Sequence, residues 1–442
     1  MAAGKGARMK SRTPKALHRV AGRDMFSWVK NAVSNTPVAN TVAVVGPEFL
    51  AGAGGSHNGT SYVVQRDRLG TGHALLQAEP LLAGRADHVL VLNADMPLIS
   101  GETLNRMMAR HLEAEATLTL LSCEVQEPGS MGRVLRGDRR EITGVVEWRD
   151  AAPEALSSNE VCCGAYCFRA DWLWPALRGL QPAPNGEYYV TALVDRASRD
   201  GWHVEGVAPV NPWEALGVNN RADLARVTAA AFEMTRQRLM DDGVTLVDPP
   251  SAFVDANVRV GMDTILQPGV IIRGNTSIGE DCDIGPNSVI EDSSIGDGCR
   301  IQGSVIEGSS IADRVQVGPY CHLRPGARLA EDVRIGNYVE VKETTVGRGT
   351  RVGHFSYLGD ADIGAEVNIG AGAVTCNYDG SRKNRTVIGD GAFIGSDSML
   401  VAPVTIGPQA VTGAGSVVTK DVPGDTLVFG VPAREKPGPE DR

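Results

Sequence analysis

The chain lacks the features that mark nucleic-acid-binding and membrane proteins. Its 442 residues carry a formal net charge of −10, and the 43 Lys and Arg residues are spread along the chain rather than gathered in a basic stripe. Such a chain has no surface suited to neutralising many phosphates of a nucleic acid. It also lacks a signal peptide and an apolar run long enough to span a bilayer. We therefore expect a cytoplasmic protein that has neither a nucleic acid nor a membrane as its partner.

The eight cysteines lack the spacing of metal ligands. Cys162, Cys163 and Cys167 form their one cluster, and neighbouring residues of a strand face opposite sides of a sheet. We predict buried, reduced thiols rather than a metal site. The chain is also too long for one ordinary hydrophobic core, so two or three domains are expected.

What the second half of the sequence does have is a period of six residues. Aliphatic residues fall six apart from Ile311 to Val341, and the same spacing returns between Val346 and Ile406. Neither a helix nor a single strand has this period. A chain that turns a corner every six residues, with three flat segments in each triangular coil, does have it. The repeats predict a left-handed parallel β-helix over residues 246–442, ending in a polar tail.

In residues 1–220, short apolar strands alternate with helical stretches. The apolar runs predict buried parallel strands at Thr41–Val45 and His88–Leu92, and the pattern that follows predicts a helix at residues 101–114. This alternation predicts an α/β domain with a doubly wound, Rossmann-like sheet. The sequence begins at a Gly-rich turn that a strand would normally precede. Either the natural gene product begins upstream of this start, or the sheet lacks its central strand. The first alternative is favoured, because the loss of a central strand exposes two edges and a core, and we expect this form to have an unstable or poorly active first domain.

The two predicted domains are joined by a linker over residues 221–245. Leu224, Val227, Ala231 and Met234 fall on one face of a helix expected from Arg221–Asp241. Gly243 and the prolines that follow would end it. We expect the β-helix to begin near residue 254.

Cations and glycines gather at the N-terminus. Residues 3–9 are Gly-rich and include Lys5 and Arg8, and Lys15 follows at a Thr-Pro turn. Glycines let backbone N–H groups approach phosphates, whose charge the cations neutralise. A second small-residue loop, residues 69–74, suits a base or a ribose. Asp95 follows a predicted strand at the ligand edge of the sheet, where a magnesium ligand is favoured over a helix cap.

These segments resemble a known enzyme family in their order and spacing. Together with Gln65, Gly132-Arg133, Glu147 and residues 187–189 and 217–221, they are similar to the uridylyltransferase half of the bifunctional N-acetylglucosamine-1-phosphate uridylyltransferase/glucosamine-1-phosphate acetyltransferases. The resemblance implies in-line attack of a sugar 1-phosphate on the α-phosphorus of UTP, with release of pyrophosphate. It implies catalysis by Arg8 and Lys15, and Mg²⁺ held by Asp95 and Asn219. The implied UTP and UDP-N-acetylglucosamine site is lined by Ala2, Ala3, Gly4, Lys15, Gln65, Gly70, Thr71, Asn93, Asp95, Gly132, Glu147, Cys162 and Asn219.

The chain departs from the pattern of this family at several positions. Ala7, Met131 and Ala192 replace a Thr, a Tyr and an Asp that are usual there. Cys162 stands where the family has an Asn that contacts the sugar. Because a thiol is the poorer hydrogen-bond donor, we expect weaker selection of N-acetylglucosamine.

Residues that interrupt the six-residue period are the candidates for chemistry in the β-helix. Arg324 and Lys342 lie one coil apart, so they are expected to stack as a phosphate clamp. An inserted loop after Val374 breaks the period, and long inserts in solenoids usually carry function. This loop is expected to bring Asn377 toward His354.

The same segments resemble the acetyltransferase half of the family. The resemblance implies that His354 is the general base, because an imidazole titrates close to neutral pH. It implies glucosamine-1-phosphate binding by Arg324, Lys342, Tyr357 and Asn368. It implies an acetyl-CoA pathway lined by Ala371, Asn377, Tyr378, Ser396 and Ala414. Glu340 is a candidate for orienting His354. The family resemblance further implies a homotrimer with acetyl-transfer sites at subunit junctions, and a role in making cell-wall precursors.

Two alternatives to the bifunctional enzyme stay open at this point. The first is an acetyltransferase with an impaired N-terminal domain, against which Asp95 and Asn219 argue. The second is a non-catalytic regulatory protein on the same domain plan. His354, Lys342 and the loop at Asn377 argue against it, since a scaffold has no need of them.

Overall fold

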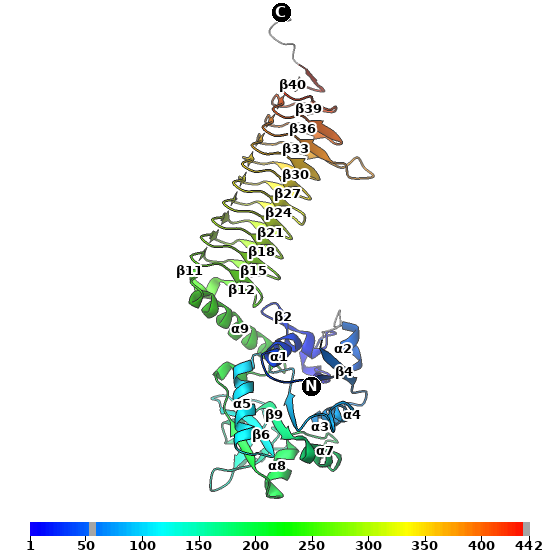
Figure 1. Cartoon of the computed structure of the whole chain (residues 1–442), viewed down its shortest axis with the longest axis vertical. Coiled ribbons are helices and arrows are strands. Elements are labelled where there is room, and N and C mark those ends of the chain that lie inside the picture. Colours follow the sequence, from blue (N-terminus) through cyan, green and yellow to red (C-terminus); the bar gives the residue numbers. More distant parts are fainter. Residues whose placement is uncertain (53–58, 436–442) are drawn as a thin grey trace, which may run out of the picture. The chain divides into compact units, whose positions relative to one another are not determined.

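The computed structural model describes residues 1–52 and 59–435, and the chain divides into two compact units, Met1–Ala231 and Phe232–Arg442 (Figure 1). The boundary falls within helix α9 (Arg221–Asp241), whose bounds confirm the prediction from the sequence. The predicted division at residues 220 and 245 brackets this helix. Across the part of the chain that the structure describes, none of the helices combines the length and the apolar composition needed to cross a membrane.

The first unit mixes short helices with strands. Its helices are α1 (Met25–Ser34), α2 (Pro47–Gly52), α3 (Thr71–Leu76), α4 (Glu79–Leu82), α5 (Gly101–Glu113), α6 (Pro153–Leu156), α7 (Ala170–Arg178), α8 (Ala192–Arg199) and the 3-10 helices η1 (Ala7–Met9), η2 (Lys15–Leu17) and η3 (Pro212–Ala215). Its strands are β1 (Arg19–Val20), β2 (Arg23–Asp24), β3 (Thr41–Val45), β4 (Thr60–Val64), β5 (His88–Leu92), β6 (Leu118–Glu124), β7 (Arg133–Arg136), β8 (Ile142–Val146), β9 (Glu160–Arg169) and β10 (Val204–Val207). The predicted bounds of β3 and β5 are confirmed, and the predicted helix at residues 101–114 is α5.

Strand β9 organises the main sheet of this unit. The order β10-β6-β9-β7-β8 has β6 parallel to β10, and β9 antiparallel to β5, β6 and β7. The prediction that His88–Leu92 has parallel neighbours is therefore wrong for β5, because the long β9 runs back between β5 and β6. Alternation along β9 puts Cys162 in one hydrophobic cluster and Cys163 in another, as expected for neighbours in a strand.

Strands β3 and β5 face each other across a gap in the sheet. Strand β3 pairs in parallel with β4 alone, and the described partner of β5 is β9. Met1 and Ala2 lie between the carboxyl ends of the two strands: the Met1 amine donates to Leu92 O, and Ala2 N donates to Val44 O at 2.7 Å. Ala2 forms a parallel bridge with Val45. Among the described residues no further strand pairs with the facing edges of β3 and β5.

The second unit is a parallel β-helix with three faces. One face stacks β11 (Thr245–Leu246), β14 (Ile265–Leu266), β17 (Asp283–Gly285), β20 (Arg300–Gln302), β23 (Gln316–Val317), β26 (Arg334–Ile335), β29 (Arg351–Val352), β32 (Asn368–Ile369), β35 (Phe393–Ile394), β38 (Val411–Thr412), β40 (Leu427–Gly430) and β41 (Ala433–Glu435); we call it face 1. Face 2 stacks β12 (Phe253–Val254), β15 (Ile271–Arg273), β18 (Val289–Glu291), β21 (Val305–Glu307), β24 (His322–Leu323), β27 (Glu340–Lys342), β30 (Tyr357–Gly359), β33 (Val374–Cys376), β36 (Met399–Val401) and β39 (Val417–Val418). Face 3 stacks β13 (Arg259–Val260), β16 (Ser277–Ile278), β19 (Ser294–Ile295), β22 (Ser310–Ile311), β25 (Arg328–Leu329), β28 (Thr345–Val346), β31 (Ala361–Ile363), β34 (Thr386–Ile388) and β37 (Val404–Ile406).

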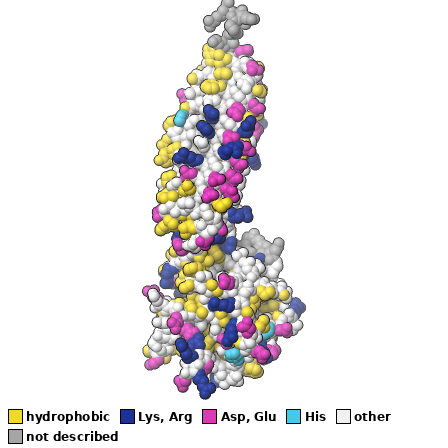
Figure 2. All heavy atoms as spheres, turned by 60° about the vertical axis from the view of Figure 1, so that its left-hand side comes forward, with side chains coloured by type: hydrophobic (Ala, Val, Ile, Leu, Met, Phe, Trp, Pro, Cys, Tyr) yellow, Lys and Arg dark blue, Asp and Glu magenta, His cyan; other side chains and the backbone are white. Residues whose placement is uncertain are grey.

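The six-residue period has the physical basis that the sequence suggests. One inward aliphatic residue per strand builds a continuous buried column that includes Ile311, Leu323, Ile335 and Val341. The β-helix begins with β11, one strand before the predicted start, because Gly243 turns the chain with a φ of 88° directly after α9. On the face of the molecule shown in Figure 2, basic side chains are interspersed with acidic ones along the β-helix.

Candidate functional sites

The first candidate site centres on the ammonium group of Lys15. Its Nζ donates to Asp95 Oδ2 at 2.7 Å and to Asn219 Oδ1 at 3.2 Å, while Arg8 Nη2 donates to the same Asn219 oxygen at 3.0 Å. Asp95 comes three residues after β5. The two cations of the N-terminal turn and the two predicted metal ligands thus meet at one point, although they come from three separate stretches of sequence.

A capping box at the start of α9 positions Asn219. Asp223 N donates to Asn220 Oδ1, and Asp223 Oδ2 accepts from the backbone N–H groups of Asn219 and Asn220. This exchange satisfies donors that a helix start leaves open. The turn at Gly6 helps to place Lys15: its φ is 61°, and a Cβ there would sit 2.8 Å from Lys15 Cβ.

The loop at residues 69–72 packs tightly on Tyr188. Gly70 has a φ of 100°, and a Cβ added there would lie 2.5 Å from Tyr188 O. The buried Gln65 donates from Nε2 to Gly70 O at 3.2 Å, and Thr71 Oγ1 accepts from Val190 N at 2.9 Å. The three residues predicted to read the base therefore form one connected group.

Thr191 extends this group to Glu147 by donating from Oγ1 to Glu147 Oε1 at 2.9 Å. Burial raises the pKa of Glu147, and the hydrogen bond from Thr191 offsets part of this rise. Cys162 N donates to Gly132 O at 2.9 Å, so these two predicted sugar contacts are also neighbours. The sequence analysis missed the link through residues 190–191, which follow the predicted motif at 187–189 directly.

Cys162 is held in the core beside the site. Its thiol donates to the Tyr166 hydroxyl at 3.2 Å, and burial raises its pKa to about 11. The thiol is therefore protonated at neutral pH. Asn93 N donates to Gly164 O at 3.1 Å, and a Cβ on Gly164 would sit 2.7 Å from Asn93 Nδ2. Gly164 thus permits β9 to lie against Asn93.

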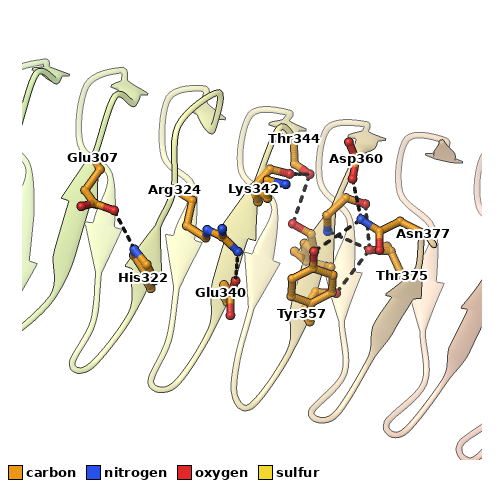
Figure 3. A network of polar contacts seen from close by, with 12 residues as sticks. Glu307, His322, Arg324, Glu340, Lys342, Thr344, Tyr357, Asp360, Thr375 and Asn377 are labelled. Atoms are coloured by element: carbon orange, nitrogen blue, oxygen red, sulfur yellow. Dashed lines mark hydrogen bonds and ion pairs between the residues drawn. The ribbon is translucent and has the colours of Figure 1, made fainter. Parts of the chain in front are cut away.

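The second candidate site lies on face 2 of the β-helix (Figure 3). The register sets Leu323 opposite Val341, and Arg324 N donates to Val341 O, so Arg324 and Lys342 occupy equivalent places on neighbouring coils. Lys383, from the inserted loop, is close enough to lower the pKa of Lys342 by the proximity of a second ammonium group. Three cations therefore gather where the sequence predicted two.

Glu340 belongs to this cationic cluster rather than to His354. Its Oε1 accepts from Arg324 Nη1 at 2.9 Å. His354 Nδ1 is instead hydrogen-bonded to Asn337 Oδ1, and Phe355 N donates to Asn337 O at 3.1 Å, which ties the two corners together. Because Asn337 Oδ1 can only accept, it selects the tautomer with hydrogen on Nδ1 and leaves Nε2 free as a base. No motif marked Asn337, which sits one coil before His354.

The predicted acetyl-CoA residues divide between two corners of the β-helix. His354, Ala371, Ser396 and Ala414 lie on successive turns from face 1 to face 2, and backbone hydrogen bonds join these turns, as from Asp397 N to Ala371 O at 2.7 Å. Asn377 lies at the other corner, beyond β33. The sequence analysis predicted that Asn377 lies near His354. In one chain the two residues lie at different corners of the β-helix, which are separated by the whole width of face 2.

Asn377 has its own polar partners at that second corner. Its Nδ2 group donates to the Asp360 carboxylate and lies 3.4 Å from the Tyr357 hydroxyl (Figure 3). Tyr378 stands in the inserted loop between β33 and β34, where its hydroxyl donates to Gly380 O at 2.7 Å. Asn368 lies on face 1 in β32, so the structure does not bring it together with Tyr357 on one face.

Comparisons with known proteins match both units. Residues 1–195 match the MobA-like NTP transferase domain, residues 281–367 match the GlmU-like C-terminal hexapeptide, and residues 257–292 and 385–420 match the bacterial transferase hexapeptide repeats. The chain is 44% identical to the bifunctional protein GlmU of Heliobacterium modesticaldum over 428 residues. These aligned residues cover 97% of this chain and 93% of that protein. It is 42% identical to the bifunctional protein GlmU of Trichlorobacter lovleyi, over 97% of this chain and 94% of that protein.

These matches run through both units and agree with the division of the polar groups between a nucleotidyltransferase-like sheet and a hexapeptide β-helix. They leave no support for the alternatives of a lone acetyltransferase or a regulatory scaffold. The chain therefore belongs to the GlmU family of bifunctional enzymes, with a uridylyltransferase in its first unit and an acetyltransferase in its second.

Proposed function

We propose that this chain makes UDP-N-acetylglucosamine in two steps, each run by the side chains described above. In the first step, an acetyl group passes from acetyl-CoA to the amine of glucosamine-1-phosphate. In the second, N-acetylglucosamine-1-phosphate attacks the α-phosphorus of UTP and expels pyrophosphate. The observation that carries the proposal is the convergence of Lys15, Arg8, Asp95 and Asn219 in one unit and of Arg324, Lys342 and Lys383 in the other.

In the acetyl transfer, the nitrogen of the sugar amine attacks the thioester carbonyl while His354 Nε2 takes a proton from that nitrogen. The carbon–sulfur bond then breaks, and the departing CoA thiolate takes the proton from the imidazolium. Asn337 holds the ring with Nδ1 protonated, so that Nε2 faces the reaction as the base. The phosphate of the sugar binds to Arg324 and Lys342, with Lys383 as a third cation. Tyr357 and Asn368 hold the sugar ring.

The thioester and its carrier would follow the corner that begins at His354. Ala371, Ser396 and Ala414 are small residues on successive turns of that corner, which lets an extended group lie against the backbone. Asn377 and Tyr378 lie across face 2 from this corner in one chain, so they would contribute from the inserted loop of a neighbouring copy, where an amide N–H can stabilise developing negative charge on a carbonyl oxygen.

We propose that a homotrimer completes the acetyl-transfer site. Within one chain the cationic cluster, His354 and Asn368 lie at two corners and on a second face, so one copy presents them to different sides. A second copy packed alongside would bring such groups together. Mixing His354→Ala chains with Arg324→Ala chains, after joint unfolding and refolding, should restore part of the acetyl transfer if copies share a site. Failure to restore any activity, with trimers formed, would contradict shared sites.

In the uridylyl transfer, Arg8 and Lys15 neutralise the triphosphate, and the backbone of Ala2, Ala3 and Gly4 borders it. Gln65, Gly70 and Thr71 read the uracil, while Asn93, Gly132, Glu147 and Cys162 line the sugar. Catalysis is then largely alignment of the attacking phosphate oxygen and stabilisation of charge on the phosphoryl group.

The residues present also fit a magnesium ion. Asp95 Oδ2 and Asn219 Oδ1 both accept hydrogen bonds from the Lys15 ammonium group. The two oxygens are therefore close enough together to share one cation. One carboxylate and one amide suit Mg²⁺, which keeps several waters and borrows phosphate oxygens. When bound, it would neutralise charge on the phosphates. Pyrophosphate release from UTP and N-acetylglucosamine-1-phosphate should require Mg²⁺ and fail in the Asp95→Asn chain. Full activity of that chain would refute the assignment.

A further inference from the structure

The arginine at the start of α9, Arg221, has no part in the chemistry described above, although it belongs to the motif at residues 217–221. Its side chain lies at the surface and reaches the N-terminal segment of the same unit. Nε donates to Met9 O at 3.1 Å, and Nη1 lies 3.5 Å from Nδ1 of His18. One guanidinium group thus contacts two separate points of that segment.

Both contacts of Arg221 are at the ends of short helices that carry the predicted phosphate-binding cations. Met9 is the last residue of η1, which includes Arg8, and His18 caps the end of η2, which begins at Lys15. A 3-10 helix of one turn has too few hydrogen bonds to hold its own position. The places of the two cations therefore depend on the contacts that other segments make with these helices.

Arg221 completes the fastening of the two helices to each other. A close approach joins their starts, since a Cβ on Gly6 would sit 2.8 Å from Lys15 Cβ. The guanidinium of Arg221 joins their ends. The turn between the helices, at residues 10–13, is exposed and buries little surface of its own. The same guanidinium also ties both helices to α9, which begins beside Asn219.

The chemical state of His18 suits this contact. Its side chain is buried, and burial together with the charge of Arg221 lowers its pKa. The ring is therefore neutral at neutral pH, and Nδ1 can accept from the guanidinium while Nε2 carries the hydrogen. Met9 is buried as well, and its carbonyl oxygen accepts from Nε of Arg221. A charged donor makes hydrogen bonds to neutral acceptors stronger.

We propose that Arg221 is a positioning residue for uridylyl transfer, which holds the two cation-bearing helices in place against the start of α9. It acts through Arg8, Lys15 and Asn219, and the inference rests on the roles proposed for them. A displacement of about 1 Å can slow a reaction roughly a hundredfold when catalysis depends on alignment. UTP would still bind through its base at residues 69–72, so the loss of Arg221 should lower kcat more than it raises KM.

The kinetic test compares Arg221→Ala with Arg106→Ala in the full chain. Arg106 also donates from its guanidinium to a backbone oxygen of a distant segment, Ala208 O, so it is a matched control outside the Lys15 cluster. We expect Arg221→Ala to lower kcat for pyrophosphate release roughly tenfold or more, and Arg106→Ala to leave it nearly unchanged. CoA release by the second unit should stay normal in both chains. A normal kcat in Arg221→Ala, or equal losses in the two variants, would overturn the proposal.

Added cations test the lost side chain itself. Because Arg221 is exposed, a small cation from solvent can enter the space that Arg221→Ala leaves. Guanidinium at millimolar concentration should restore part of kcat, since its planar donors can bond to two acceptors at once. Methylammonium carries the same charge on a compact group and should restore less. Equal rates with the two cations would contradict a bridge between two helices.

Hydrogen exchange tests the position of the two helices without any activity. The amides of Met9 and His18 each donate to a carbonyl oxygen of the same helical turn. Both should exchange roughly tenfold faster or more in Arg221→Ala, and at the normal rate in Arg106→Ala, because only the first change frees the ends of these helices. An unaltered chain that releases no pyrophosphate would refute the proposed function, whereas the exchange rates would still decide the inference. Unchanged exchange at both amides in Arg221→Ala would overturn it.

Discussion

Replacing Asn337 with Ala tests how His354 is made into a base. The change removes the acceptor of the His354 Nδ1–H bond but leaves every charge of the sugar-phosphate cluster in place. A net loss of about 0.5–1.5 kcal/mol for one neutral hydrogen bond corresponds to a rate loss of roughly two- to thirteenfold. We expect this loss in kcat for acetyl transfer, followed by release of free CoA. The KM for glucosamine-1-phosphate should hold, because Arg324 and Lys342 are untouched.

Three controls sharpen this prediction. Asn337→Asp keeps an oxygen acceptor toward Nδ1 and should retain much of the rate. Asn275→Ala removes an exposed Asn from a turn of another coil and should change nothing. Pyrophosphate release by the first unit should stay unchanged in all three chains. An Asn337→Ala chain with normal kcat, or one whose defect lies in KM alone, would refute the role given to this hydrogen bond.

Other predictions concern the remaining parts of the chain. Gly70→Ala should cost roughly 1–3 kcal/mol of unfolding free energy and reduce uridylyl transfer at least tenfold, because its Cβ would meet the Tyr188 backbone at a φ of 100°; a normal melting curve and rate would contradict this. His111 is buried beside His88, and burial lowers its pKa to about 4. Since the unfolded imidazole binds a proton near pH 6.5, stability should fall as pH drops from about 6.5 to about 4, by on the order of 2–3 kcal/mol; denaturant titrations should show a flatter profile for His111→Gln. Asp379 accepts from the backbone N–H groups of Ser381 and Arg382, so Asp379→Ala should loosen the inserted loop and raise the KM for acetyl-CoA roughly three- to tenfold; an unchanged KM would separate the loop from acetyl-CoA binding.

The sequence was sufficient where a period or a cap fixes the structure locally. The six-residue period predicts the buried column of the β-helix because each coil repeats the same inward position. The helix Arg221–Asp241 and the strands β3 and β5 were also predictable, from amphipathic spacing and from short apolar runs. Stacking of Arg324 and Lys342 followed from the length of one coil.

What could not be predicted depends on contacts between distant segments. Asn337 is an ordinary turn residue until the coil above places His354 against it. The return of β9 between β5 and β6 leaves no mark in either strand, since apolar runs look alike with parallel and antiparallel neighbours. The position of Asn377 was misjudged because spacing along the chain counts coils but does not say at which of the three corners an insert begins.

The central claim is that two independent sites on the two units perform the two reactions. It is tested most directly by measuring free CoA and pyrophosphate in parallel for His354→Ala and Asp95→Ala chains. We predict that His354→Ala abolishes CoA release and spares pyrophosphate release, whereas Asp95→Ala does the opposite. Loss of both activities in either folded chain, or loss of neither, would contradict the account.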